Sequence, residues 1–225
     1  MKVENTEKSW NKSPLILRII GMGVPYFVKT PWWLKKIYPG RLWDIQSEEK
    51  TVYLTFDDGP HPVATPFVLD ELKKYNAKAT FFCIGKNVID HPGIYKRILE
   101  EGHRVGNHTL NHRNGWKTGD DLYLSEITEA ASHIQSDLFR PPYGRLKSSQ
   151  AKKLKDYRII MWDVLSGDFD ESLSNERCLK NVISKTNTGS IVVFHDSEKA
   201  FPHLTYAIPK CLEFFSKEGY SFRKI

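Results

Sequence analysis

Two adjacent carboxylates and a pair of histidines are the residues of this sequence with the clearest chemistry. Asp57 and Asp58 follow the apolar run Val52–Phe56, and His108 and His112 stand four positions apart further along the chain. Histidines at this spacing can project to one side of a helical turn and share a metal ion with a carboxylate. Two imidazoles and one carboxylate leave a coordination position for water, which is typical of a catalytic zinc site.

Adjacent carboxylates can divide the work of hydrolysis. One binds a cation and stays ionised, while the other accepts a proton from water. A divalent ion lowers the pKa of water toward about 7, which makes a nucleophile available near neutral pH. Taken alone, Asp58-Gly59-Pro60 could be an ordinary turn. The histidine pair makes metal ligation the better interpretation.

Two further motifs could supply the remaining groups of a hydrolase. His195 is a candidate general acid, because the leaving amine of an amide must be protonated as it departs. A histidine that merely ends a strand is the alternative. In the Arg-Pro-Pro-Tyr-Gly motif at 140–144, the paired prolines stiffen a loop. The N–H of Tyr143 could then stabilise an oxyanion, and Arg140 could hold Asp57 by a bidentate bond.

Alternating strands and helices would bring these motifs together. Helical periodicity covers 124–134 and 208–215, and Gly102, Gly189 and Gly219 stand where helices should end. This alternation predicts a parallel α/β sheet, open or closed into a barrel, whose loops converge at the carboxyl ends of the strands. The predicted strands are Val52–Phe56, Ala79–Ile84, His103–Gly106, Arg158–Val164, Ile191–Phe194 and Tyr220–Ile225.

The length and charge of the chain fit one catalytic domain with an N-terminal extension. The net charge of +6 is spread along the 225 residues, and no basic stripe interleaved with aromatics indicates nucleic-acid binding. The Pro39-Gly40 pair and the polar run Gln46–Lys50 mark a boundary. We therefore expect an extension over residues 1–46 and a catalytic domain over residues 47–225.

The extension is first apolar and then aromatic. Arg18 interrupts the apolar stretch from Pro14 to Val28, which is shorter than the roughly 20 residues that a membrane span needs. No small-residue cleavage site of a secretory signal follows it. The aromatic and basic segment Lys29–Trp43 could lie on a membrane or pack over the main domain, and we favour packing. Localisation is left open between the cytoplasm and the cell envelope.

Taken together, the motifs resemble those of the polysaccharide deacetylases, a carbohydrate esterase group with NodB-type homology. Thr55–Pro60 resembles the first motif of that family, His108–His112 the second, Arg140–Gly144 the third, and the strand that ends in His195 the fifth. These motifs stand in family order from Thr51 to the C-terminus. The resemblance implies a distorted (β/α) barrel, complete or incomplete, that removes N-acetyl or O-acetyl groups from sugar polymers.

The resemblance also implies a role for each motif residue. Asp57 is then the base, His195 is the acid, and Arg140 orients the base. The backbone N–H of Tyr143 helps to form the oxyanion hole. One divalent ion is implied, with Zn²⁺ as the first choice and Co²⁺ or Ni²⁺ as alternatives. Its ligands are Asp58, His108 and His112.

The fourth motif of the family departs from its pattern in this chain. The family has an Asp, three intervening residues and a Trp, and the Asp supports the catalytic histidine. With Trp162 as the anchor, Leu165 falls at the position of that Asp. We therefore expect Asp163 or Asp168 to hold His195 instead.

Three functions fit this pattern. The leading hypothesis is the removal of N-acetyl groups from a glycan, such as peptidoglycan, a chitin-like polymer or another surface polysaccharide. An O-acetyl esterase acting on a polysaccharide would use the same activated water. A non-catalytic glycan-binding relative would use Trp32, Trp33 and Trp43 to stack on sugars. The expected partner is an acetylated glycan, membrane association is not favoured, and the oligomeric state is left open.

Overall fold

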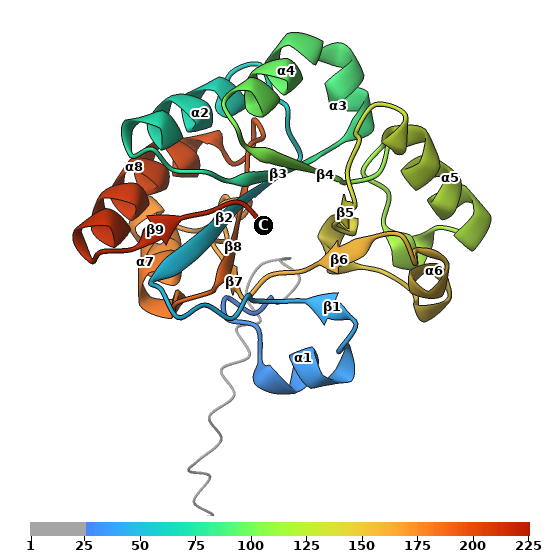
Figure 1. Cartoon of the computed structure of the whole chain (residues 1–225), viewed down its shortest axis with the longest axis horizontal. Helices are drawn as coiled ribbons and strands as arrows, with labels where there is room; N and C mark the ends of the chain where they lie inside the picture. The colour runs from blue at the N-terminus through green and yellow to red at the C-terminus, as the bar shows by residue number, and fades with distance from the viewer. Residues whose placement is uncertain (1–25) are drawn as a thin grey trace, which may run out of the picture.

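A curled sheet of parallel strands forms the centre of the molecule, and helices cover its outer side (Figure 1). The computed structural model describes residues 26–225. Its strands are β1 (Arg41–Leu42), β2 (Thr51–Asp57), β3 (Thr80–Cys83), β4 (Arg104–Asn107), β5 (Leu138–Phe139), β6 (Arg158–Ile160), β7 (Val164–Leu165), β8 (Ile191–His195) and β9 (Ser221–Phe222). The order is β1-β6-β5-β4-β3-β2-β8-β7, with β9 beside β2. The predicted parallel α/β sheet is confirmed.

The sheet curls because consecutive stretches of chain lie at its two ends. Strands β6 and β7 stand near opposite ends of the strand order, yet only residues 161–163 separate them. The N–H of Met161 donates to the carbonyl of Leu42 in β1 at 2.7 Å, and that of Asp163 donates to the carbonyl of Ile191 in β8 at 2.9 Å. The single strand predicted over Arg158–Val164 is therefore wrong, since the chain crosses from one sheet edge to the other there. The result is a distorted, incomplete (β/α) barrel.

Helices fill the connections between the strands. The stripes predicted at 124–134 and 208–215 correspond to α5 and α8, and Gly102, Gly189 and Gly219 follow helices with positive φ. The helices are α1 (Trp32–Ile37), α2 (Ala64–Lys74), α3 (Gly85–Asp90), α4 (Pro92–Glu100), α5 (Asp120–Ala131), α6 (Ser148–Lys153), α7 (Asn175–Lys185) and α8 (Phe201–Lys217), with 3₁₀ turns η1 (Gly115–Lys117) and η2 (Pro142–Gly144).

Strand β2 lies between two apolar clusters, and its polar residues Thr55 and Asp57 face the inside of the curled sheet. Its even-numbered residues join the apolar cluster beneath the helices, where Phe56 stacks on the rings of Phe81 and Phe194 at 5.0 and 6.1 Å. Tyr53 belongs to another cluster, inside the curled sheet. Because side chains alternate along a strand, Thr55 and Asp57 share the inner face with Tyr53. The strand thereby delivers a carboxylate to the interior of the barrel.

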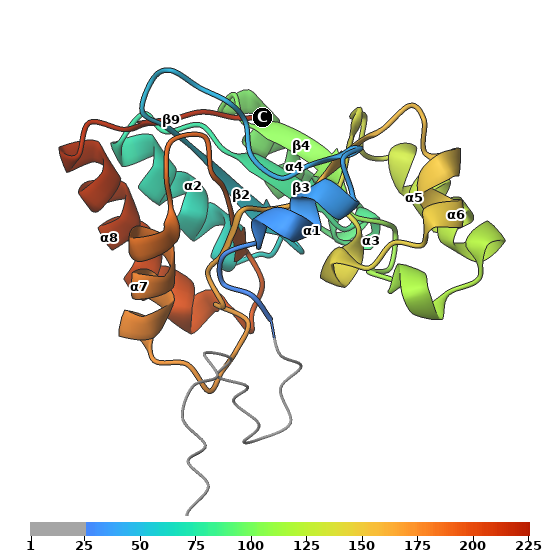
Figure 2. The same cartoon turned by 90° about the horizontal axis from the view of Figure 1, so that it is seen from below.

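Residues 26–46 contact both ends of the sheet, because the stretch around Lys29 pairs with β7 and β1 pairs with β6. The N–H of Leu165 donates to the carbonyl of Val28, and that of Thr30 donates to the carbonyl of Asp163, both at 2.8 Å. Figure 2 shows α1 in the middle of the view, between α7 and α8 on one side and α5 and α6 on the other. The apolar stretch of the sequence analysis falls largely on residues 14–25, outside the described part of the chain. Within residues 26–225, no helix has both the length and the apolarity needed to span a membrane.

Candidate active site

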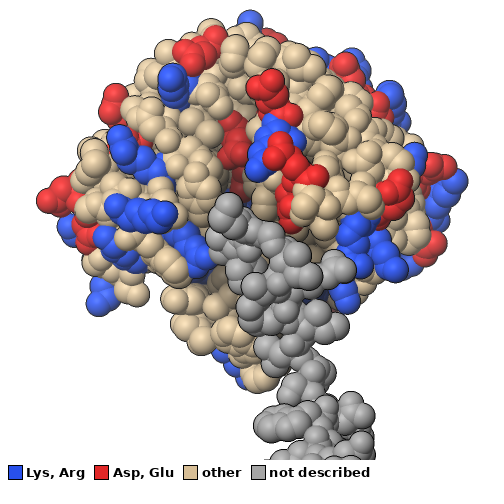
Figure 3. Space-filling view, turned by 180° about the vertical axis from the view of Figure 1, so that it is seen from behind, with Lys and Arg blue, Asp and Glu red and all other residues tan. Residues whose placement is uncertain are grey.

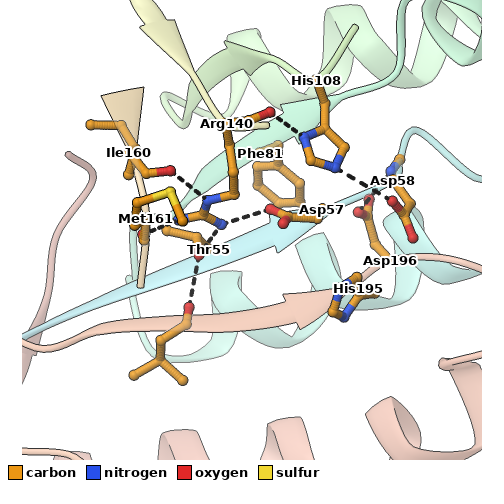
Figure 4. A network of polar contacts seen from close by, with 12 residues as sticks. Thr55, Asp57, Asp58, Phe81, His108, Arg140, Ile160, Met161, His195 and Asp196 are labelled. Carbon is orange, nitrogen blue, oxygen red and sulfur yellow. Dashed lines mark hydrogen bonds and ion pairs between the residues drawn. The ribbon is translucent and has the colours of Figure 1, made fainter. Parts of the chain in front are cut away.

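The carboxyl ends of four strands bring the sequence motifs together. In the register of β2 with β8, Asp57 is the direct partner of His195. Strand β4 ends at Asn107, directly before His108, and β5 ends directly before Arg140. Figure 4 shows these side chains gathered at the ends of the strands. The structure thus places four of the predicted motifs at one edge of the sheet, as parallel α/β folds require of a functional crevice.

Three side chains at this edge could hold a metal ion. The Nε2 atoms of His112 and His108 lie 3.2 and 3.7 Å from Oδ1 of Asp58, and the three donor atoms all lie within 4.8 Å of one another. Oδ1 of Asp58 is buried and accepts no hydrogen bond from residues 26–225. A buried oxygen without a donor, facing two ring nitrogens, fits a divalent cation, and this donor set suits zinc.

The protonation states of His108 and Asp58 suit ligation. Nδ1 of His108 lies 2.7 Å from the carbonyl oxygen of Arg140, which can only accept, so the ring proton sits on Nδ1 and Nε2 is free. Burial lowers the pKa of His108 to about 4, which keeps its imidazole neutral. Burial acts to raise the pKa of Asp58, but the contact with His112 and the charges of His195 and His108 hold it well below its usual range.

The backbone around this group is held in conformations that L-residues rarely adopt. Among residues 26–225, five non-glycine residues have positive φ, and four of them surround the site: Asp58 at 83°, Thr109 at 65°, His112 at 55° and Tyr143 at 59°. Such conformations cost about 1–3 kcal/mol each and cluster at functional sites. The loop geometry therefore orients the side chains at the expense of local stability.

Asp57 is fixed from behind by a buried arginine. Arg140 is fully buried, and its Nη1 donates to Oδ1 of Asp57 at 2.6 Å. The bond is single rather than bidentate as predicted, because the guanidinium also donates to Thr55 Oγ1 at 2.8 Å and to the carbonyls of Ile160 and Met161 at 3.3 and 3.0 Å. Oδ2 of Asp57 accepts no hydrogen bond from residues 26–225 and stays available.

His195 is held by Asp168, one of the two predicted alternatives. Its Nδ1 lies 2.7 Å from Oδ1 of Asp168, and its backbone N–H donates to Oδ2 at 2.7 Å. Gly167, with a φ of 82°, turns the chain after β7 and brings Asp168 under the imidazole. The ring of Phe169 packs edge-on against that of His195 at 5.3 Å.

Asp163, the other alternative, has partners other than His195. It bonds Nζ of Lys29 at 2.5 Å, Nζ of Lys35 at 2.7 Å and the hydroxyl of Ser190 at 2.6 Å. Its position between β6 and β7 directs the side chain toward the N-terminal segment. The proposal that Asp163 supports the acid is therefore corrected, and its contacts are those of a structural anchor.

The electrostatics favour a protonated His195. Burial acts to lower the pKa of this imidazole, but the charge and the hydrogen bond of Asp168 outweigh it. The charges of Asp58 and Asp57 act in the same direction, and together they raise the pKa of His195 to about 10. At neutral pH the ring is thus a proton donor, as a general acid must be.

Tyr143 lies at the mouth of the site. Its side chain is 60% exposed, and its ring centroid lies 4.6 Å from that of His112. Its backbone N–H donates to no atom of residues 26–225, so this N–H is available to an oxyanion, as the sequence analysis expects.

Two buried acids beside the site were given no role by the sequence analysis. Asp196 accepts the N–H of Gly59 at 3.0 Å and the hydroxyl of Thr65 at 2.5 Å, and burial raises its pKa to about 8. A Cβ on Gly59 would lie 2.0 Å from Oδ2 of Asp196, so only glycine fits beside this carboxylate. Glu126 on α5 is the second. The only signal for Asp196 was its place directly after His195.

The surface charge is mixed rather than concentrated. Figure 3 shows the side of the molecule opposite to the view of Figure 1, and among the described residues basic and acidic side chains are interspersed there. The net charge of +6 is thus not gathered into one stripe on this face.

Comparison with known proteins agrees with this fold and site. The chain matches a family profile described as polysaccharide deacetylase over residues 44–162. It is 34% identical over 188 residues to a peptidoglycan-N-acetylglucosamine deacetylase of Bacillus cereus, and the match covers 80% of this chain and 88% of that protein. A protein of the same name from Listeria monocytogenes is 37% identical over 179 residues, which cover 77% of this chain and 37% of that protein.

A solved structure shows the same architecture. It is a peptidoglycan N-acetylglucosamine deacetylase in complex with an N-oxidanyl-benzamide compound, and it matches with a TM-score of 0.80 and 31% identity. The match covers 87% of this chain and 95% of that one. The chain belongs to the polysaccharide deacetylase family, and the relatives named above are deacetylases, which are hydrolases acting on carbon–nitrogen bonds other than peptide bonds. The predicted family and enzyme class are confirmed.

Proposed function

We propose that this protein removes N-acetyl groups from a cell-wall glycan, and that it acts at the cell envelope on peptidoglycan. One observation carries the proposal: Asp57 and His195 are partners on adjacent strands beside the group of Asp58, His108 and His112, and a buried residue fixes each of the pair. The names of the Bacillus and Listeria relatives support peptidoglycan as the substrate.

The side chains divide the reaction between them. Asp58, His108 and His112 would hold a divalent ion, which when bound would supply Lewis-acid chemistry, with a lower pKa for water and a polarised carbonyl. Oδ2 of Asp57 accepts the proton of the attacking water, whose oxygen bonds to the acetyl carbon. The N–H of Tyr143 donates to the oxyanion that forms there.

His195 completes the reaction. The protonated imidazole gives its proton to the sugar nitrogen as the carbon–nitrogen bond breaks, and acetate and a free amine leave. Asp168 keeps Nδ1 engaged at 2.7 Å, so Nε2 is the nitrogen that can reach the substrate. An amide needs this step more than an ester does, because an amine anion is a poorer leaving group than an alkoxide.

The ion is proposed to be zinc. Two imidazole nitrogens and one carboxylate oxygen are the donors of many catalytic zinc sites, although cobalt and nickel suit the same set. Elemental analysis of protein purified without added metal, followed by chelation and reconstitution with each ion, identifies the ion that restores activity.

Acetate release tests the function. We expect release from N-acetylglucosamine oligomers and peptidoglycan, loss of release with a chelator, and little release from O-acetylated xylan. A higher kcat/KM on the O-acetylated polymer would make the protein an esterase instead. Binding of the glycans without any acetate release by the metal-loaded protein would make it a glycan-binding relative.

A further inference from the structure

A large aromatic side chain stands exposed on the loop that follows the second candidate ligand. Trp116 lies in η1, four residues after His112, and 53% of it is exposed. A surface tryptophan has a structural reason when it fills a gap between elements. The loop that carries Trp116 is held by other contacts.

The loop is fixed by polar contacts that do not involve the indole. The N–H of Trp116 donates to the side chain of Asn114 at 3.0 Å, which caps η1. The buried side chain of Gln150 donates to the carbonyl of Gly115 at 3.0 Å. A Cβ on Gly115 would lie 2.4 Å from the carbonyl oxygen of Arg145, so only glycine allows this close approach. A rigid loop therefore presents Trp116 to solvent.

Arg145 supports the indole from one side and links it to the site. Its guanidinium carbon lies 4.1 Å from the centroid of the Trp116 ring. Tyr143, two residues before Arg145, is 60% exposed, and its ring centroid lies 4.6 Å from that of His112. We call Tyr143, Arg145 and Trp116 the aromatic ledge. It extends from the edge of the candidate metal group outward along two loops that pack on each other.

The chemistry of the ledge suits a sugar ring. Exposed aromatic faces on a rigid support mark binding surfaces, because their apolar area is displayed at little entropic cost. The C–H face of a pyranose is a flat apolar surface that matches an indole, and a guanidinium can donate to ring hydroxyls or to a carboxylate. We propose that the aromatic ledge binds a sugar unit of the glycan strand adjacent to the unit that is deacetylated. This inference rests on the proposed function.

The test compares a long and a short substrate. The probes are the tetramer of N-acetylglucosamine and 4-nitrophenyl acetate, an ester that carries no sugar unit to occupy the proposed subsite. For Trp116→Ala, we expect the ratio of kcat/KM on the tetramer to that on the ester to fall about tenfold, mainly through KM. Trp116→Phe should recover most of the ratio.

The matched control is Phe214→Ala. Phe214 is an exposed aromatic residue on α8, across the barrel, and its substitution should leave the ratio unchanged (Figure 1).

Calorimetry with the tetramer separates this proposal from the proposed function. If the wild-type protein binds the tetramer and Trp116→Ala weakens that binding, the proposed sugar-binding role of the aromatic ledge is supported. This holds even if the protein releases no acetate, in which case only the proposed deacetylase function is wrong. An unchanged ratio and unchanged tetramer affinity in Trp116→Ala would overturn the ledge. So would an equal loss on both substrates, because it would indicate a damaged loop rather than a lost subsite.

Discussion

Asp57 and His195 are register partners on adjacent parallel strands, and a buried residue of opposite charge holds each of them. Arg140 bonds one carboxylate oxygen of Asp57, and Asp168 bonds Nδ1 of His195. Within residues 26–225, each of the two keeps one reactive atom without a hydrogen bond, Oδ2 of the aspartate and Nε2 of the histidine. The charge and hydrogen bond of Asp168 favour the protonated imidazole of His195, and this geometry fits the proposed roles of Asp57 as base and His195 as acid.

The two adjacent carboxylates should respond differently to substitution. Asp57→Asn keeps the shape of the side chain but cannot accept the proton, so we expect metal content to stay and kcat to fall about 10²–10⁴-fold. Asp58→Ala removes the only carboxylate of the metal group and should lose the ion. Elemental analysis and acetate release measure both effects. Loss of metal from Asp57→Asn would contradict this division.

The pH profile should depend on Asp168. Activity requires protonated His195 and falls as the pH rises through its pKa, which lies at about 10 because the carboxylate of Asp168 outweighs burial. Asp168→Asn removes that charge, so the pKa falls and the alkaline limb of kcat moves to lower pH. A pH series of acetate release on both proteins measures the shift.

Asp163→Asn is the matched control for that pH series. Asp163 is also a buried carboxylate, but its partners are two lysines of the N-terminal segment and Ser190 rather than His195. We therefore expect Asp163→Asn to leave the alkaline limb of kcat in place. An equal displacement of the limb in both variants would contradict the assignment of Asp168.

The places of the candidate site residues could be predicted because each stands at the end of an apolar strand. Asp57, His108 and His195 follow buried runs, and parallel strands bring such ends to one edge. The choice between Asp163 and Asp168 could not be made in this way. It depends on the turn that follows β7 and on the crossing of the chain between β6 and β7, which are tertiary features.

The contacts of the residues that support the site could not be predicted from the sequence for a different reason. Glu126 stands in a helix among other polar residues, where a carboxylate usually faces solvent, and only the folded structure shows that it is buried. The single bond from Arg140 to Asp57 likewise depends on competition from backbone carbonyls of β6 and the residue after it. Sequence patterns describe faces and spacings, whereas these contacts depend on how separate elements meet.

Glu126 should tune the affinity for the ion by holding the residues on both sides of His112. Its carboxylate accepts the N–H of Asn111 at 2.8 Å and Nε–H of Arg113 at 2.7 Å. Both residues flank His112, so we expect Glu126→Gln to weaken metal binding about tenfold, within the range known for residues that orient ligands. Competition with a chromophoric chelator measures the dissociation constant. The matched control is Glu129→Gln, an exposed residue of the same helix, and equal affinities in the two variants would contradict the role of Glu126.

Asp163 should contribute to stability rather than to catalysis. Its carboxylate is buried and joins Lys29 and Lys35 of the N-terminal segment to Ser190 beside β8. Asp163→Ala leaves a buried hydroxyl and two partly buried ammonium groups without this acceptor, so we expect a loss of about 2 kcal/mol in the free energy of unfolding. Urea denaturation measures it, and Lys36→Ala, which removes an exposed ammonium from the same helix as Lys35, is the control. Because the N-terminal segment closes the edge beside β7, an unchanged midpoint in Asp163→Ala would mean that this edge is held by its backbone hydrogen bonds alone.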